Sequence, residues 1–223
     1  MKLVSWLLDL LFPPRCMICH KLIEPNEKPV CGECLSHLPE FDGAAPKVRF
    51  ADKVCIGFYY ENTFREAFLR FKFHGREEYA EQYGRWLALR IRDKLPEEFD
   101  VISYVPVSRR RKAQRGYDQT ERICRVVSQE LQISMHTLLI KHRHTKPQSG
   151  IRQREQRAAN ASGAYRATNN EFIAGKRILL LDDIITTGAT LSECCRVLTT
   201  AGAKRVCVAA LATPREGEER ETL

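Results

Sequence analysis

Apolar residues gather in short runs along this chain, and stretches with helical spacing separate the runs. The runs lie at 54–60, 99–107, 164–168, 178–181 and 206–212. Such short apolar runs are typical of strands that are buried in a parallel sheet. Helices are expected from Asn62 or Thr63 onward, at 77–94, at 119–131, and from the loop at 186–190 to a cap at Gly202. This alternation predicts an α/β fold in which helices flank a parallel sheet.

Two acids stand directly after the run at 178–181. Asp182 and Asp183 are followed by the segment Thr186-Thr187-Gly188-Ala189-Thr190 and then by a helix. Glycine lets an anion approach the backbone, N–H groups at a helix N-terminus point toward that anion, and threonine hydroxyls add donors. Carboxylates beside such a loop would repel phosphate, so they suit the vicinal hydroxyls of a sugar or a hydrated magnesium ion. The alternative is an ordinary strand–helix connection with capping threonines.

Two C-x-x-C pairs near the N-terminus predict a structural zinc site. The pairs are Cys16 with Cys19 and Cys31 with Cys34. Each pair can place two thiolates on one tetrahedral centre, and four thiolates close that centre to catalysis. A pair of redox motifs or an accidental spacing is the alternative. The remaining cysteines lie in apolar patterns and are expected in the core: Cys55, Cys124, Cys194, Cys195 and Cys207. The segment 39–46 reads as the linker out of this module.

The chain is basic, with a formal net charge of +8 over 223 residues. This charge favours anionic partners, such as phosphorylated metabolites, nucleic acid or an acidic membrane surface. One basic group, Lys72 and Arg76, ends the first helix, and a second, 109–112, follows the strand at 99–107 as a loop. A basic loop at the end of a strand beside the acidic strand is placed to grip pyrophosphate. Solvated faces or contact with nucleic acid are the alternatives. The long polar loop 141–163 could close over a ligand or lie against a nucleic-acid backbone.

Residues 1–15 form a short apolar segment that ends in two prolines. The apolar run is too short to span a bilayer, carries Asp9 and lacks a cleavage site for secretion. We therefore expect a cytoplasmic protein without a transmembrane segment, whose N-terminal helix docks on its own protein, a partner or a membrane surface. The expected organisation is an apolar helix at 1–15, a zinc module at 16–42, a main domain at 47–213 and a frayed tail at 214–223.

The acid pair and the threonine loop resemble the ribose-phosphate signature of type I phosphoribosyltransferases. The order of motifs along the chain resembles one branch of that superfamily, the ComF family. The motifs that carry this resemblance are LFPPRCMIC at 11–19, CGEC at 31–34, FKFHGR at 71–76, VPVSRRR at 105–111, RGYDQ at 115–119, QSG at 148–150 and RAANASGAY at 157–165. The family commonly has Asn where Asp118 stands and Phe where Tyr165 stands.

The resemblance implies a type I phosphoribosyltransferase-like sheet with an N-terminal four-cysteine zinc module. It also implies a role for each candidate site residue. Asp182 and Asp183 would bind ribose hydroxyls or magnesium, and the loop Thr186, Thr187, Gly188, Ala189 and Thr190 would bind the 5′-phosphate. Pyrophosphate or a DNA backbone would meet Val107, Ser108, Arg109, Arg110, Arg115, Lys72 and Arg76. The flexible loop would contribute Gln148, Ser149, Gly150 and Arg157.

The implied function is a competence protein that acts in DNA uptake during natural transformation. It would bind single-stranded DNA together with 5-phosphoribosyl 1-diphosphate or a 5′-phosphate, with structural zinc and with magnesium on the phosphoribosyl ligand. A helicase of the uptake machinery is the implied protein partner, and peripheral association with the membrane uptake complex is consistent with it. The alternative is an active phosphoribosyltransferase that transfers the phosphoribosyl group to an acceptor that the sequence does not identify and releases pyrophosphate.

Overall fold

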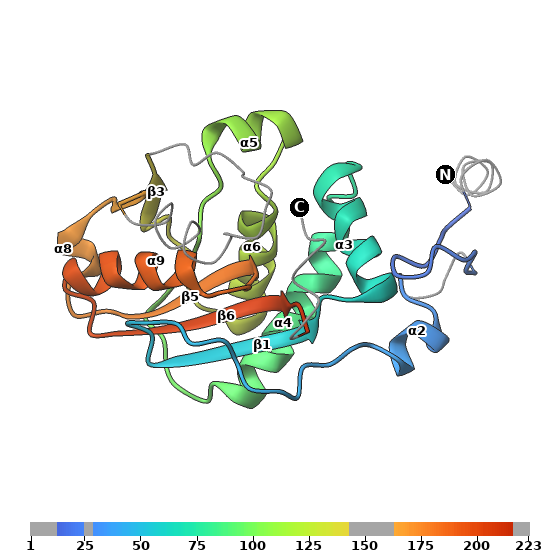
Figure 1. Ribbon diagram of the computed structural model, residues 1–223, viewed down its shortest axis with the longest axis horizontal. Coiled ribbons are helices and arrows are strands. Elements are labelled where there is room, and N and C mark those ends of the chain that lie inside the picture. The colour runs from blue at the N-terminus through green and yellow to red at the C-terminus, as the bar shows by residue number, and fades with distance from the viewer. Residues whose placement is uncertain (1–12, 25–28, 143–162, 216–223) are drawn as a thin grey trace.

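A computed structural model describes residues 13–24, 29–142 and 163–215 of the chain (Figure 1). Most of the predicted N-terminal helix and of the tail lies outside these residues. So do the predicted loop residues Gln148, Ser149, Gly150 and Arg157. Within the described part of the chain, no helix combines the length and apolar character that crossing a bilayer requires.

Four parallel strands form the central sheet, in the order β1-β6-β5-β2. Their bounds are Lys53–Tyr59 for β1, Val101–Tyr104 for β2, Arg177–Ile184 for β5 and Arg205–Thr213 for β6. The acid-bearing strand β5 is internal, with Leu181 opposite Ala209 of β6 and opposite Tyr104 of β2. The parallel sheet predicted from the apolar runs is therefore confirmed.

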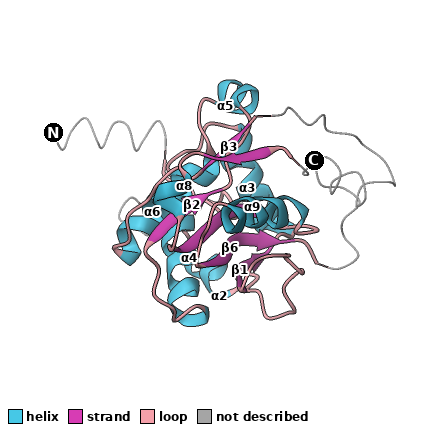
Figure 2. Ribbon diagram, turned by 90° about the vertical axis from the view of Figure 1, so that its left-hand side faces the viewer, coloured by secondary structure: helices cyan, strands magenta, loops and turns pink. Residues whose placement is uncertain are grey.

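Helices cover both faces of the sheet (Figures 1 and 2). On one face lie α3 (Asn62–Phe73), α4 (Tyr79–Lys94) and α6 (Gln119–Leu131), and on the other lies α9 (Ala189–Thr200). Leu179 and Leu181 of β5 face the first group, whereas Ile178 and Leu180 face α9. This alternation follows from the two-residue period of a strand and explains why both faces of β5 are apolar.

Short elements complete the described part of the chain. They are α2 (Gly32–Ser36), α5 (Arg109–Arg115), α8 (Asn170–Ile173) and the antiparallel pair β3 (Leu139–Lys141) and β4 (Tyr165–Ala167). The return strand expected at 164–168 is confirmed as β4, and the helix at 119–131 is confirmed with the same bounds. The five cysteines assigned to the core are all buried.

Three predicted boundaries were wrong. The strand expected at 99–107 ends at Tyr104, because Pro106 has no N–H to donate to a sheet. The first helix begins at Asn62 with Glu61 in the N-cap position and without a side-chain cap, so neither Asn62 nor Thr63 caps it. The first residues of the predicted linker 39–46 pair with the outer edge of β1, since Tyr59 N–H donates to Pro39 O (2.7 Å) and Phe41 N–H donates to Gly57 O (3.0 Å).

The helices α4 and α6 approach closely at Gly84. A Cβ built at Gly84 would lie 2.5 Å from Cβ of Val126, an atom that cannot move without its backbone. We expect Gly84→Ala to lower the free energy of unfolding by about 2 kcal/mol through overpacking, measured by urea denaturation. Gly32→Ala is the matched control, because a Cβ at Gly32 meets nothing within 4 Å. Equal stability of the Gly84→Ala protein and the native protein would contradict this account of the helix contact.

Candidate functional site

The two acids occupy the carboxyl end of β5, beside the end of β2. Asp182 and Asp183 are the sixth and seventh residues of the eight-residue strand, so the strand itself fixes their backbone. The Asp182 side chain is half-buried, and Asp183 is 8% exposed. Asp182 accepts a hydrogen bond from Asp183 N–H (2.8 Å). Because successive residues of a strand point to opposite faces of the sheet, the two carboxylates lie in different surroundings.

Asp183 is held by groups from two helices on one face of the sheet. Lys72 of α3 places its Nζ atom 3.0 Å from Asp183 Oδ2. Gln119, the first residue of α6, donates its Nε2–H to the same oxygen (2.7 Å). Asp183 Oδ1 accepts from Ile184 N–H (2.6 Å). Lys72 is 6% exposed and Gln119 is 2% exposed, so this cluster is a buried polar network that depends on complete pairing.

The two neighbouring carboxyl groups differ in pKa. Burial raises the pKa of Asp182 well above its ordinary value, and the negative charge of Asp183 raises it further. Burial acts in the same direction on Asp183, but the Lys72 charge and the Gln119 hydrogen bond outweigh it and hold the pKa of Asp183 below its ordinary value. Asp183 is therefore the member of the pair whose negative charge the protein itself stabilises.

The threonine loop leads from the acids into α9. Gly188 takes the N-cap position of this helix in a left-handed conformation, with φ +71°, and no side chain caps the helix there. A Cβ at Gly188 would lie 2.8 Å from Lys47 O, so the position requires glycine on two counts. Thr187 Oγ1 accepts only a long bond from Ala189 N–H (3.4 Å). A twelve-residue helix whose N-terminus lacks a side-chain cap is a setting in which N–H groups can receive an anion.

The basic segment after β2 forms the short helix α5, so its prediction as a loop was wrong. Ser108 caps this helix by accepting from Arg111 N–H (3.4 Å), and Gly116 ends it in a left-handed conformation. Asp118 joins the segment that precedes α5 to the start of α6. It is 3% exposed, caps α6 through Thr120 N–H and Glu121 N–H, and accepts from Val107 N–H (3.0 Å). Asparagine can make the same cap, which is a structural role rather than an anion contact.

The predicted basic residues fall into three places. Arg109 and Arg110 are exposed on α5, and Arg115 stacks its guanidinium group over the Phe73 ring at 4.7 Å. Burial lowers the pKa of Arg115, and the negative charge of Asp183 opposes this shift. Lys72 lies at the acid pair. Arg76, by contrast, pairs with Glu78 (3.5 Å) and lines a groove of about 670 Å³ beside the cysteine module.

Two residues of the site carry no clear signal in the sequence. Gln119 stands inside a motif of the resemblance, but nothing in that motif indicates that its side chain is buried and donates to Asp183. Lys141 of β3 lies over the Tyr165 ring of β4 at 5.2 Å, and burial lowers the pKa of Lys141 and raises the pKa of Tyr165. The strand β3 is too short for a periodic pattern, so no sequence signal could have placed it.

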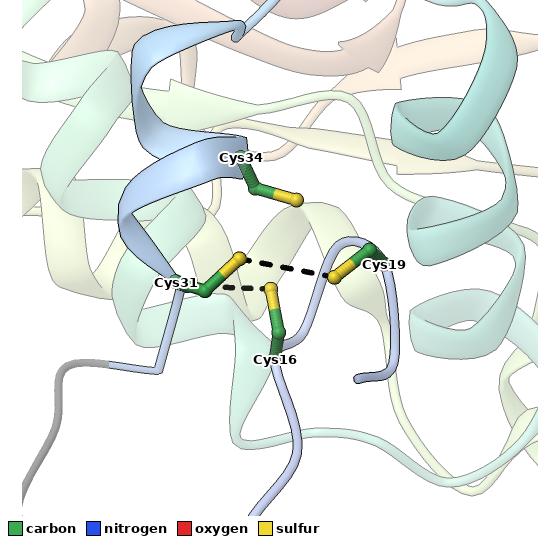
Figure 3. Close-up of side chains that lie close together, drawn as sticks. All are labelled: Cys16, Cys19, Cys31 and Cys34. Carbon is green, nitrogen blue, oxygen red and sulfur yellow. Dashed lines mark hydrogen bonds between the residues drawn. The ribbon is translucent and has the colours of Figure 1, made fainter. Parts of the chain in front are cut away.

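The four predicted zinc ligands converge on one point (Figure 3). Their sulfur atoms all lie within 4.8 Å of one another, and Cys19 Sγ lies 3.8 Å from Cys31 Sγ. Sulfurs on a tetrahedral zinc ion with Zn–S distances of about 2.3 Å are about 3.8 Å apart, so the donor set fits zinc in number, type and spacing. Burial works to raise the pKa of the Cys16 thiol, but N–H groups of Cys31, Cys19 and Ile18 lower it to about 7.

The cysteine module is packed into the main domain. Met17, between the first two cysteines, is fully buried in the same core as Phe64, Phe68 and Phe71 of α3. Arg70 of α3 donates to Met17 O (3.0 Å) and to Ile18 O (2.6 Å). The helix that carries Lys72 to the acid pair therefore also holds the cysteine module.

Comparisons with known proteins agree with this division of the chain. Residues 121–222 match the model of the phosphoribosyl transferase domain, and residues 7–46 match that of the double zinc ribbon domain. Competence protein F of Haemophilus influenzae is 32% identical over 192 residues, which cover 82% of this chain and 77% of that protein. Competence protein ComFC of Bacillus subtilis is 27% identical over 207 residues, or 87% and 83% of the two chains. The DNA utilization protein YhgH of Escherichia coli O157:H7 is 25% identical over 183 residues, or 79% and 74%.

Metal analysis tests the cysteine centre. We expect about one zinc ion per chain by plasma mass spectrometry, and a content near zero in Cys34→Ala, because three thiolates leave the centre open to competing chelators. Cys55→Ala is the control, since Cys55 is a buried core cysteine outside the cluster, and its zinc content should equal that of the native chain. Zinc retained by Cys34→Ala, or two zinc ions per chain, would contradict a single four-thiolate centre.

Proposed function

The chain belongs to the competence protein F family, and from this membership we propose that it acts in DNA uptake by binding single-stranded DNA and a phosphoribosyl ligand. The ligand is 5-phosphoribosyl 1-diphosphate or a nucleic-acid 5′-phosphate. The names of its relatives support the role in competence and DNA utilization. One observation supports the ligand above all. The acid pair lies at the carboxyl end of β5, the α9 N-terminus that lacks a side-chain cap follows that strand, and the basic α5 follows the neighbouring strand β2.

Each part of the ligand has a chemically matched group. The ribose hydroxyls donate to Asp182 and to the remaining acceptor position of Asp183. The 5′-phosphate sits in the loop 186–190, where N–H groups and hydroxyls of the first turn of α9 surround it. The pyrophosphate lies toward Ser108 and Arg115. Val107 N–H is already donated to Asp118, so Val107 shapes this part of the site without a backbone hydrogen bond of its own to the ligand.

Magnesium enters this proposal with the ligand. Ribose hydroxyls and pyrophosphate oxygens are the hard oxygen donors that Mg²⁺ prefers, and the ion keeps several waters when it binds nucleotides. A water molecule on this ion could donate to Asp182, which has acceptor positions to spare, whereas Asp183 is engaged by Lys72, Gln119 and Ile184. The bound ion would supply neutralisation of the pyrophosphate charge.

The exposed face of α5 is the proposed contact for single-stranded DNA. Arg109 and Arg110 form no ion pair within the described residues, and they are exposed together with Arg111 and with Lys112, which pairs with Glu121. Phosphate contacts by such residues supply affinity that is independent of sequence. In this proposal the protein works in the cytoplasm beside a helicase of the uptake machinery, at the membrane uptake complex where the strand enters.

Calorimetric titration tests the phosphoribosyl ligand. We expect the native chain to bind 5-phosphoribosyl 1-diphosphate in the presence of Mg²⁺, and Asp182→Asn to weaken this binding about tenfold or more, because a hydroxyl loses a charged acceptor. Asp93→Asn is the control: it neutralises a carboxylate that pairs with Lys94 on the surface. No heat of binding with the native chain, or equal affinity in Asp182→Asn, would remove the ligand from this pocket.

The salt dependence of DNA binding tests the basic helix. We expect Arg109→Gln/Arg110→Gln to bind an oligothymidylate more weakly and to reduce the slope of log K against log salt by about 1.4, at about 0.7 for each lost phosphate contact. Lys94→Gln removes a surface charge of another helix and should leave the slope unchanged. Fluorescence anisotropy between 50 and about 300 mM salt measures both. An unchanged slope in the double variant would place the DNA elsewhere.

A further inference from the structure

Lys72 is a buried cation beside the acid pair, and burial removes its charge from most contact with solvent. It lies in the last turn of α3, with its ammonium group 4.9 Å from the centre of the Phe68 ring and 3.0 Å from Asp183 Oδ2. Its side chain is 7% exposed. A lysine is almost never buried without a partner, because desolvation of its charge is costly. The ion pair with Asp183 is therefore the reason that this lysine can lie here at all.

The bonding capacity of Asp183 is nearly filled by the protein. An ionised carboxylate has about four acceptor positions. Lys72 and Gln119 share Oδ2, and Ile184 N–H takes one position on Oδ1. A divalent cation at Asp183 would have to displace the ammonium group or stand next to it, against the repulsion between two cations in a buried site. The residues present at Asp183 therefore do not fit direct coordination of a magnesium ion.

We propose that Lys72 is a built-in counter-cation for the acid pair, which lets the pair accept the ribose hydroxyls of its ligand without coordinating a divalent cation directly. This inference rests on the proposed function and deepens it. Lys72 halves the formal negative charge of the pair, so an anionic phosphate can approach the neighbouring loop with less repulsion. The requirement for a divalent cation then comes from the pyrophosphate of the ligand, not from the acids.

A second feature supports a hydroxyl ligand at this point. Gln119 Oε1 is buried and has no hydrogen-bond partner among the described residues. Its Nε2 must face Asp183, because the reverse orientation would set two acceptor oxygens against each other. The remaining oxygen is an acceptor next to the acid pair that a ligand hydroxyl can satisfy, and an unsatisfied buried acceptor in a native structure calls for such a partner.

Manganese binding tests the counter-cation without any phosphoribosyl ligand. The zinc-loaded full-length chain is titrated with Mn²⁺ alone and followed by electron paramagnetic resonance. We expect that the native chain has no Mn²⁺ site that Asp182→Asn weakens. Lys72→Met should gain a new site that binds Mn²⁺ about tenfold or more tightly than the native chain does, because the acid pair loses its cation. Lys72→Arg keeps the charge and should resemble the native chain. Lys112→Met removes the lysine of a surface pair with Glu121 and should create no site.

Ribose 5-phosphate provides the second measurement, because it has the hydroxyls and the 5′-phosphate but no pyrophosphate. Its affinity for the native chain should change less than twofold when Mg²⁺ is added, whereas Lys72→Met should gain a requirement for Mg²⁺. A native site for Mn²⁺ that Asp182→Asn abolishes would overturn the inference, as would binding of ribose 5-phosphate that depends on Mg²⁺. If Lys72→Met fails to fold, the comparison of the native chain with Asp182→Asn still decides.

The two proposals can fail separately. If neither 5-phosphoribosyl 1-diphosphate nor ribose 5-phosphate binds, the proposed pocket is refuted. The manganese titration then still tests the role of Lys72 as a counter-cation. A native manganese site with normal binding of 5-phosphoribosyl 1-diphosphate would refute the counter-cation and leave the pocket intact.

Discussion

Backbone hydrogen bonds hold β5 in the sheet along both of its edges, and the rest of the site depends on this pairing. Leu181 is in register with Tyr104 of β2 and Ala209 of β6, and Val105 N–H extends the pairing to Leu181 O (2.9 Å). Parallel pairing brings the carboxyl ends of the strands to one edge of the sheet. The acids, the threonine loop and the basic helix are distant in sequence, yet this register places each of them at that edge.

Burial restricts the polar side chains around the acid pair to a fixed arrangement. Lys72, Asp118, Gln119 and Asp183 are all less than 10% exposed, and each takes part in at least one hydrogen bond or ion pair. Partly satisfied networks in a core are costly, so these bonds favour one arrangement of the four side chains, in which Gln119 Oε1 has no partner among the described residues. Asp118 shows this well: one carboxylate caps α6 and anchors the exit of β2, which fixes α5 relative to the acid pair.

The sheet, the four-cysteine cluster and the turn that leads into α9 could be predicted because each has a local signal. Apolar runs indicated β1, β5 and β6, and the spacing of Cys16, Cys19, Cys31 and Cys34 indicated a single centre. The partners of Asp183 could not be predicted, because Lys72 and Gln119 reach it from helices that are 111 and 64 residues away along the chain. Contacts of that kind follow from tertiary packing. The same holds for the edge pairing of residues 39–41 with β1, which no composition rule distinguishes from a loop.

The position of Arg70 on α3 has a further consequence. Its guanidinium group holds the backbone of the first cysteine knuckle, and two residues later the same helix presents Lys72 to Asp183. Met17, which lies between the first two cysteines, is buried in the same core as the aromatic side chains of this helix. One turn of α3 thus connects the cysteine module with the acid pair, because Arg70 and Lys72 lie on the same helix two residues apart.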